Sequence, residues 1–133
     1  MPCYLRFAGL HFDVDSFIKE SGVTPDSFSR RGDDIHSRRY PSCTIRSSCR
    51  YDVSESDFDD FKGQVSDVIA FLNKHVKALS CWREYNLDHA PNLDFGIYTR
   101  MFKVDAQSDF FPAELIRLAG ELGASIEFSQ YSE

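Results

Sequence analysis

The segment from Asp94 to Tyr131 constrains the fold more than any other part of the chain, because its pattern predicts a strand, a loop, a helix and a second strand. Pro112 suits a first helical turn, where the N–H group that proline lacks is not needed. Gly123 suits the end of that helix, where a left-handed residue is favoured. The segment therefore indicates a domain that combines helices with a sheet, but it contains no catalytic motif.

Upstream of this segment, hydrophobic periodicity predicts two strands and the longest helix. Apolar and polar residues alternate over Cys3–Ala8 and over Ser42–Val53, which is typical of half-buried strands. Steps of three and four predict a helix over Asp57–Leu79, capped by Ser54 or Ser56. The apolar stripe of this helix consists of Phe58, Phe61, Val65, Val68, Ile69, Leu72, Val76 and Leu79.

Shorter elements complete the prediction. A short helix follows Asp13, and strands are expected over Cys81–Leu87, Leu93–Phe102 and Ala124–Tyr131. The order from the second strand onward is that of a ferredoxin-like βαββαβ unit, preceded by an extra strand and helix. We therefore expect a single α+β domain over residues 1–133, with a largely antiparallel sheet and helices on one face.

The opposite face of the predicted sheet is expected to be open to solvent. Gly96 leaves a gap in its outer row, which predicts a bulge or close packing by a neighbour. The side chains expected on this face are Tyr4, Arg6, Arg46, Arg50, Tyr98, Arg100, Glu127 and Tyr131.

Composition and charge narrow the classes of protein. The net charge of −6 is a poor match for nucleic acid and a good match for a basic protein. No apolar run reaches the roughly 20 residues that span a bilayer, and no signal-peptide pattern opens the chain, so a cytoplasmic location without membrane contact is expected. The cysteines are expected to be reduced, because an extended strand would separate Cys43 from Cys49 by about 20 Å.

Catalytic and metal motifs are not found in the sequence. It contains no Cys-x-x-Cys or His-x-x-x-His spacing, no G-x-S-x-G element and no glycine-rich phosphate loop. We therefore expect no metal, no cofactor and no enzymatic activity.

Three parts of the chain carry a resemblance to a known family. They are the strand that ends in Phe-Ala-Gly with its following helix (Phe7–Ser21), the loop from Pro25 to Asp33, and the closing proline-started helix and strand that end at Tyr131. Together they resemble an uncharacterised bacterial family of small cytoplasmic domains of unknown function. The tryptophan usual before the long helix of that family is missing, and the only tryptophan is Trp82. The resemblance implies no catalytic residues, and small acidic proteins of this kind are similar to the immunity partners of toxins.

The leading hypothesis is a non-enzymatic protein-binding module, in its most concrete form an immunity-type protein that neutralises a basic bacterial toxin. The residues expected to bind the partner are Asp57, Asp59 and Asp60, which attract it, and Tyr98, Arg100 and Tyr131, which anchor it.

Two alternatives remain open. One is a domain that binds a small anionic ligand, or an enzyme, and uses the arginine-rich loop 30–50 with Arg38, Arg39 and Arg46. The other is a structural domain that forms a homodimer through its sheet faces.

Overall fold

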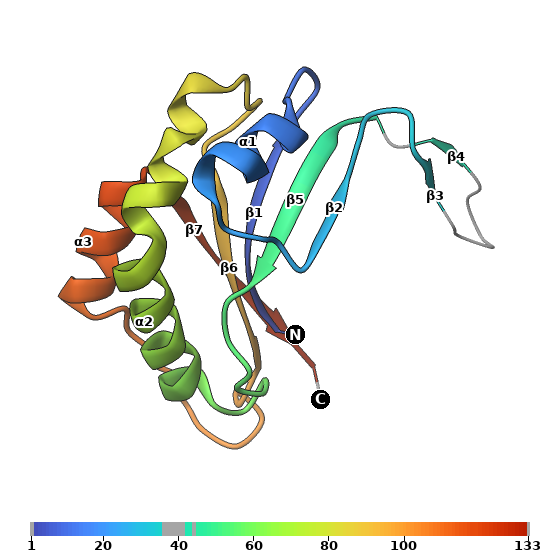
Figure 1. Cartoon of the computed structure of the whole chain (residues 1–133). Coiled ribbons are helices and arrows are strands. Elements are labelled where there is room, and N and C mark those ends of the chain that lie inside the picture. Colours follow the sequence, from blue (N-terminus) through green and yellow to red (C-terminus); the bar gives the residue numbers. More distant parts are fainter. Residues whose placement is uncertain (1, 36–41, 44, 133) are drawn as a thin grey trace.

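A computed structural model of the chain describes residues 2–35, 42–43 and 45–132. The elements follow one another in an order that alternates strands with helices (Figure 1). They are β1 (Cys3–Gly9), α1 (Val14–Ser21), β2 (Ser27–Ser29), β3 (Asp34–Ile35), β4 (Ser42–Cys43), β5 (Ser47–Asp52), α2 (Phe61–Leu79), the 3-10 helix η1 (Ser80–Glu84), β6 (Asn92–Tyr98), α3 (Ala113–Leu122) and β7 (Ser125–Tyr131).

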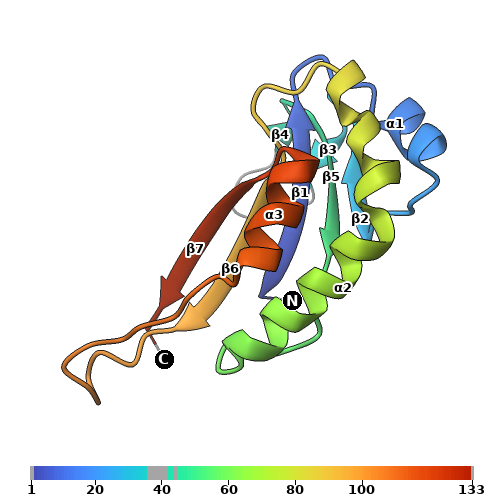
Figure 2. The ribbon, with the colours of Figure 1, turned by 90° about the vertical axis from the view of Figure 1, so that its left-hand side faces the viewer.

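The main sheet has five strands in the order β2-β5-β1-β6-β7, and α1, α2 and α3 cover one of its faces (Figures 1 and 2). All neighbouring pairs are antiparallel except β6 and β7, which are parallel because α3 carries the chain back before β7 begins. The α+β class and the one-sided helices are therefore confirmed. The largely antiparallel character of the sheet is also confirmed, but the strand order and the parallel pair β6 and β7 differ from the ferredoxin-like unit that the sequence predicts.

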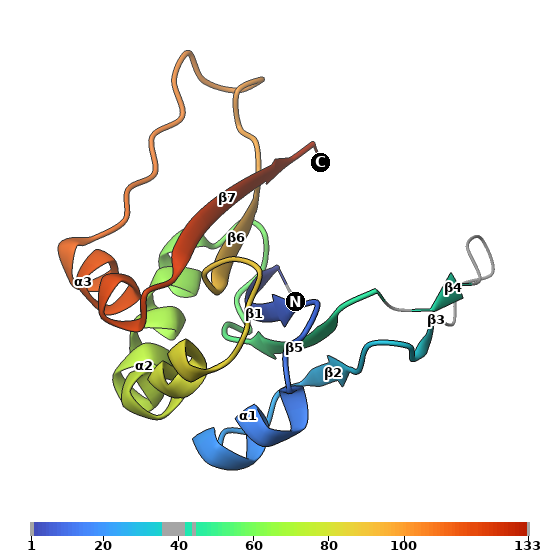
Figure 3. The same cartoon turned by 90° about the horizontal axis from the view of Figure 1, so that it is seen from above.

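A separate hairpin of β3 and β4 projects from the end of the sheet (Figure 3). It accounts for one wrong prediction, that of a continuous strand over Ser42–Val53. β4 pairs with β3, whereas β5 pairs with β1 and β2, so the two halves belong to different sheets. Ile45 lies between them and is 69% exposed rather than on the buried face.

The core lies between the sheet and the helices. Cys3, Leu5 and Phe7 alternate along β1 with residues that face the open side, as predicted, and all three are fully buried. β6 is buried over most of its length. The predicted stripe of α2 is confirmed for six residues that are buried in this core: Phe61, Val65, Val68, Leu72, Val76 and Leu79.

The segment after α2 is a 3-10 helix and not the predicted strand over Cys81–Leu87. Its side chains bind the end of α3, where backbone carbonyls lack helical partners. Trp82 Nε1 donates to the carbonyl of Leu122 at 2.7 Å, and Arg83 donates to that of Glu121 at 3.0 Å. Gly123 ends α3 with φ 80°, and a Cβ atom there would lie 3.0 Å from the Trp82 ring. This packing therefore requires the glycine that the sequence places there.

Gly96 fulfils the prediction of close packing by a neighbour. A Cβ atom at this position would lie 2.8 Å from the carbonyl oxygen of Pro2 and 3.2 to 3.3 Å from the rings of Tyr131 and Phe58. The gap in the outer row of β6 is therefore filled by aromatic rings.

Cysteine thiols lie in the centre of the sheet. Cys3 on β1 and Cys49 on β5 are free and buried, and burial raises the pKa of both thiols. Cys81 is free as well, so these three cysteines agree with the expectation of reduced thiols.

The stripe of α2 gives a test of the helix faces. Leu72→Ala should lower the free energy of unfolding by roughly 2–5 kcal/mol, because the side chain is fully buried and its loss leaves a cavity. Asp59→Ala should cost far less, because Asp59 is exposed. Urea denaturation followed by circular dichroism would measure both, and equal losses would contradict the assignment.

Candidate functional site

Most residues predicted to bind a partner gather at one end of the sheet. The segment 54–60 before α2, the ends of β6 and β7, and the long segment 99–111 before α3 all lie at this end (Figures 1 and 2). We call it the tip surface. It comprises the predicted residues Asp57, Asp59, Asp60, Tyr98, Arg100 and Tyr131, together with the exposed apolar residues Met101, Phe102, Val104 and Phe110.

An aromatic contact joins three parts of the tip surface. The ring centroid of Phe58 lies 5.1 Å from that of Tyr98 and 5.5 Å from that of Tyr131. The carbonyl of Phe58 also accepts a hydrogen bond from the backbone N–H of Tyr98 at 3.0 Å. The sequence stripe assigned Phe58 to the helix, but it lies before α2 and fills the space beside Gly96. Tyr98 is therefore half-buried, while Tyr131 remains 49% exposed.

A buried amide holds the segment 54–60 against the sheet. Gln64 on α2 is fully buried, and its Nε2 donates at 2.9 Å both to the carbonyl of Asp57 and to that of Gly96. Sequence reasoning missed this residue. Its signal is a polar side chain on the apolar stripe of α2, three residues after Phe61 and four before Val68. A polar group in such a position must find hydrogen-bond partners.

A carboxylate on α2 holds the same segment from the other side. Asp67 accepts hydrogen bonds from the hydroxyl groups of Ser54 at 2.7 Å and Ser56 at 3.1 Å. The two hydrogen bonds, that from Ser54 foremost, hold the pKa of Asp67 below its ordinary value. The two serines therefore bind this side chain, and the predicted serine cap of α2 is wrong.

The three predicted aspartates have different local roles. Asp60 caps α2 by accepting from the N–H of Gly63 at 2.9 Å, so the helix begins at Phe61 and not at Asp57. Asp57 accepts from the N–H of Phe58 at 2.7 Å. Asp59 is exposed and lines a hollow of about 220 Å³. The other residues around this hollow are Tyr98, Thr99, Arg100, Phe102 and Lys103. The structure thus brings three of the predicted residues together.

The segment 99–111 is folded on itself by polar contacts. The guanidinium of Arg100 lies 3.2 Å from the carboxylate of Asp109, and its backbone N–H donates to Gln107 at 2.6 Å. The predicted strand over Leu93–Phe102 ends early, at Tyr98, because a turn follows it. Met101 lies beyond the end of the strand and is 53% exposed.

A second hollow, of about 250 Å³, lies between this segment and α2. Its lining is mostly apolar and includes Phe61, Val65, Phe110 and Pro112, with Lys62 and Asp109 among its polar members. The segment 99–111 therefore contributes to two adjacent hollows, one with charged walls and one with apolar walls.

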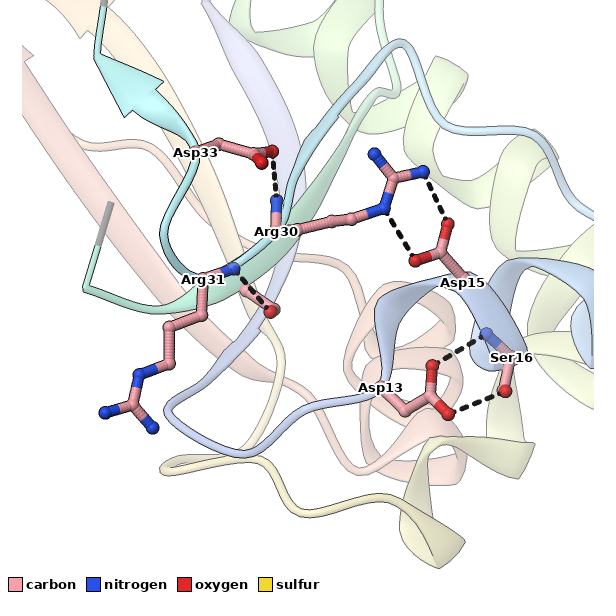
Figure 4. A network of polar contacts seen from close by, with 7 residues as sticks. Asp13, Asp15, Ser16, Arg30, Arg31 and Asp33 are labelled. Atoms are coloured by element: carbon pink, nitrogen blue, oxygen red, sulfur yellow. Dashed lines mark hydrogen bonds and ion pairs between the residues drawn. The ribbon is translucent and has the colours of Figure 1, made fainter. Parts of the chain in front are cut away.

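In its described part, the arginine-rich loop forms hydrogen bonds and an ion pair with nearby acidic residues. Arg30 binds the carboxylate of Asp15 through two hydrogen bonds of 2.8 Å, and its backbone N–H donates to Asp33 at 2.7 Å (Figure 4). These bonds from Arg30 lower the pKa of Asp15. The guanidinium of Arg31 points away from this ion pair (Figure 4).

Of the three arginines proposed for an anionic ligand, Arg46 belongs to the part of the chain that the structure describes. Arg46 forms an ion pair with Asp88, and the guanidinium of Arg46 lowers the pKa of the Asp88 carboxyl group. Arg38 and Arg39 lie outside the described residues.

The open face of the sheet carries a further hollow of about 250 Å³, lined by residues that include Tyr4, Arg6 and Glu127. Arg50, beside it on β5, lies 5.7 Å from the Tyr4 ring and 3.3 Å from Asp52. These contacts agree with the expected polar face: Arg50 contacts Tyr4 on the neighbouring strand β1 and Asp52 on its own strand.

Within the described part of the chain, no three histidine, cysteine or acidic side chains lie close enough to hold a metal ion. No helix there is long and apolar enough to cross a membrane.

The hydrogen bonds of Asp67 predict a pH dependence of stability. Because its pKa is lower in the folded state, Asp67 stabilises the fold above its ordinary pKa of about 3.9 and ceases to do so as the pH falls through the lower folded-state value. Asp67→Asn should therefore cost roughly 1 kcal/mol at pH 7 and much less near pH 2. Chemical denaturation across this range would measure the difference. Asp59→Asn is the control, and a cost for Asp67→Asn that does not depend on pH would contradict the assignment.

Comparison with known proteins and protein families identifies the family of this chain. No match to the chain was found among curated proteins or among solved structures. The resemblance to a family of unknown function is confirmed at that level. The family described as Domain of unknown function (DUF4279) matches residues 1–133, and the chain belongs to it.

Proposed function

We propose that the chain is a non-enzymatic protein-binding module whose contact site is the tip surface. The observation that carries this proposal is the exposure of large apolar side chains on one short segment. Phe102 is 66% exposed and Phe110 is 79% exposed, with Met101 and Val104 beside them. Apolar side chains gathered on one surface, with polar residues around them, are typical of interaction sites.

The surroundings of this segment define the kind of partner. Asp57 and Asp59 are exposed beside it, and the whole chain carries a net charge of −6. Exposed charge of one sign raises the rate at which a partner of opposite charge associates. A basic protein is therefore the partner that fits this surface.

The two hollows supply specific contacts for such a partner. The hollow beside Asp59 offers the Asp59 carboxylate together with Arg100 and Lys103, whose Nζ lies 4.9 Å from the centroid of the Phe102 ring, so it suits a polar or charged side chain of the partner. The hollow of Phe61, Val65 and Phe110 suits an apolar side chain. The half-exposed ring of Tyr131 extends the contact toward the sheet.

The most concrete form of this proposal is an immunity-type protein that blocks a basic toxin. Its support is the small size of the chain, its acidic balance and the acidic, aromatic character of the tip surface. Co-purification from the native cell would identify the partner.

With the partner in hand, we expect the charges and the rings to act on different rates. Replacing Asp57, Asp59 and Asp60 together by Asn should slow association several-fold and flatten its dependence on salt. Asparagine keeps the cap and turn contacts of Asp57 and Asp60, so the fold should be unaffected. Surface plasmon resonance at several salt concentrations would measure this.

Phe102→Ala or Tyr131→Ala should instead speed dissociation by about tenfold or more, because each ring is lost from the contact. Phe28→Ala is the matched control, since Phe28 is 47% exposed and lies on β2, on the opposite edge of the sheet. Equal effects of all three variants would contradict the tip surface as the contact site. If no protein co-purifies and a small anion raises the melting temperature, the anionic-ligand alternative replaces this proposal.

A further inference from the structure

The two edges of the main sheet are unequal. β2 forms one edge and has three residues, whereas β7 forms the other and has seven (Figure 2). Sheet edges in natural proteins are commonly protected by short strands, charged side chains (lysine above all), proline or bulges. The edge strand β2 is short. The sequence of β7, SIEFSQY, has one charged residue, Glu127, and no proline, lysine or arginine.

The hydrogen bonds of β7 show which backbone groups face outward. Ser125 N–H donates to Pro91, and the carbonyl of Tyr131 accepts from Thr99, both at 2.8 Å, so these odd-numbered residues bond toward β6. Backbone bonding alternates along a strand. The N–H and C=O groups of Ile126, Phe128 and Gln130 therefore point away from β6, where the described chain has no further strand.

We propose that a second copy of this chain occupies this edge, so that the two β7 strands pair antiparallel across a two-fold axis. The choice of occupant rests on the self-complementarity of the strand. The outward groups of Ile126, Phe128 and Gln130 meet those of the second copy only if even-numbered residues face even-numbered residues. Three symmetric registers meet this condition and pair five or more residues, and they centre on Glu127, Phe128 and Ser129.

The side chains select one of these registers. Centring on Glu127 would place the two Glu127 carboxylates directly opposite, which is destabilising. Centring on Ser129 would pair only residues 127–131. Centring on Phe128 pairs all seven residues and places Glu127 opposite the second copy's Ser129, which is neutral. Ile126 then faces the second copy's Gln130.

The Phe128-centred register also covers apolar surface. Phe128 is half-buried, and on its inner side its ring lies 5.6 Å from that of Phe61 and 5.9 Å from that of Phe111. In the dimer the two Phe128 rings become cross-strand neighbours on the helix-covered side of a ten-stranded sheet. Aromatic pairs of this kind stabilise sheets.

This inference is separate from the proposed function, because it uses the backbone edge of β7, which shares only Tyr131, the last residue of that strand, with the tip surface. Salt distinguishes the two. Both copies carry a net charge of −6, so added salt should tighten the dimer, whereas it should weaken binding of a basic partner.

The test is the mass of the chain in solution, measured by sedimentation equilibrium from about 1 to 100 µM. We expect a dimer. Gln130→Pro removes an outward N–H and no bond to β6, and it should weaken the dimer by at least about tenfold because two symmetric bonds are lost. Gln130→Ala keeps the N–H and is the matched control. A wild-type monomer throughout the range, or equal dissociation constants for both variants, would overturn the proposal.

Hydrogen exchange of the unaltered chain gives a second, independent measurement. The amides of Ile126, Phe128 and Gln130 should exchange more slowly as concentration rises, because they are bonded only in the dimer. Exchange of these three amides that does not depend on concentration would refute edge pairing even if Gln130→Pro failed to fold.

Discussion

The fold and the tip surface both depend on four phenylalanine rings that pack where α2 crosses the sheet. Phe61 of α2 lies 5.7 Å from Phe95 of β6 and 5.6 Å from Phe128 of β7, measured between ring centroids. Phe111 closes the group, at 5.3 Å from Phe95 and 5.9 Å from Phe128. Each such pair contributes about 0.5–1.5 kcal/mol beyond the area it buries. The cluster fixes the C-terminal end of the segment 99–111 to the core, while Phe110, one residue earlier, is left in solvent.

Local chemistry explains why the C-terminal part of the fold could be predicted. Pro112 and Gly123 limit α3 by their own backbone preferences, and the stripe of α2 needs only a nearby apolar sheet. The 3-10 helix after α2 could not be predicted in this way, because Trp82 and Arg83 bind carbonyls of α3 that follow some 40 residues later in the chain. The parallel pairing of β6 and β7 likewise depends on where α3 packs, which periodicity does not encode.

In the candidate site, too, local patterns could be predicted and contacts between distant residues could not. The outer row of β6 correctly grouped Tyr98 with the nearby Arg100, and Asp59 joins them in one hollow. The exposure of Phe102 was missed because the strand pattern extends beyond Tyr98, and only the turn held by Gln107 and Asp109 ends it. The role of Gln64 depends on the carbonyls of Asp57 and Gly96, the second of them 32 residues away, and no spacing in the sequence identifies them.

The burial of Cys3 and Cys49 has a kinetic consequence. The two residues lie on β1 and β5, neighbouring strands inside the sheet, and are 0% and 1% exposed. A thiol reacts with an alkylating reagent as the thiolate, and a buried thiol with a raised pKa offers neither the charge nor the access. Labelling of these two sulfurs must therefore wait until the middle of the sheet comes apart. The rate at which these two thiols are labelled therefore reports how often β1 and β5 separate.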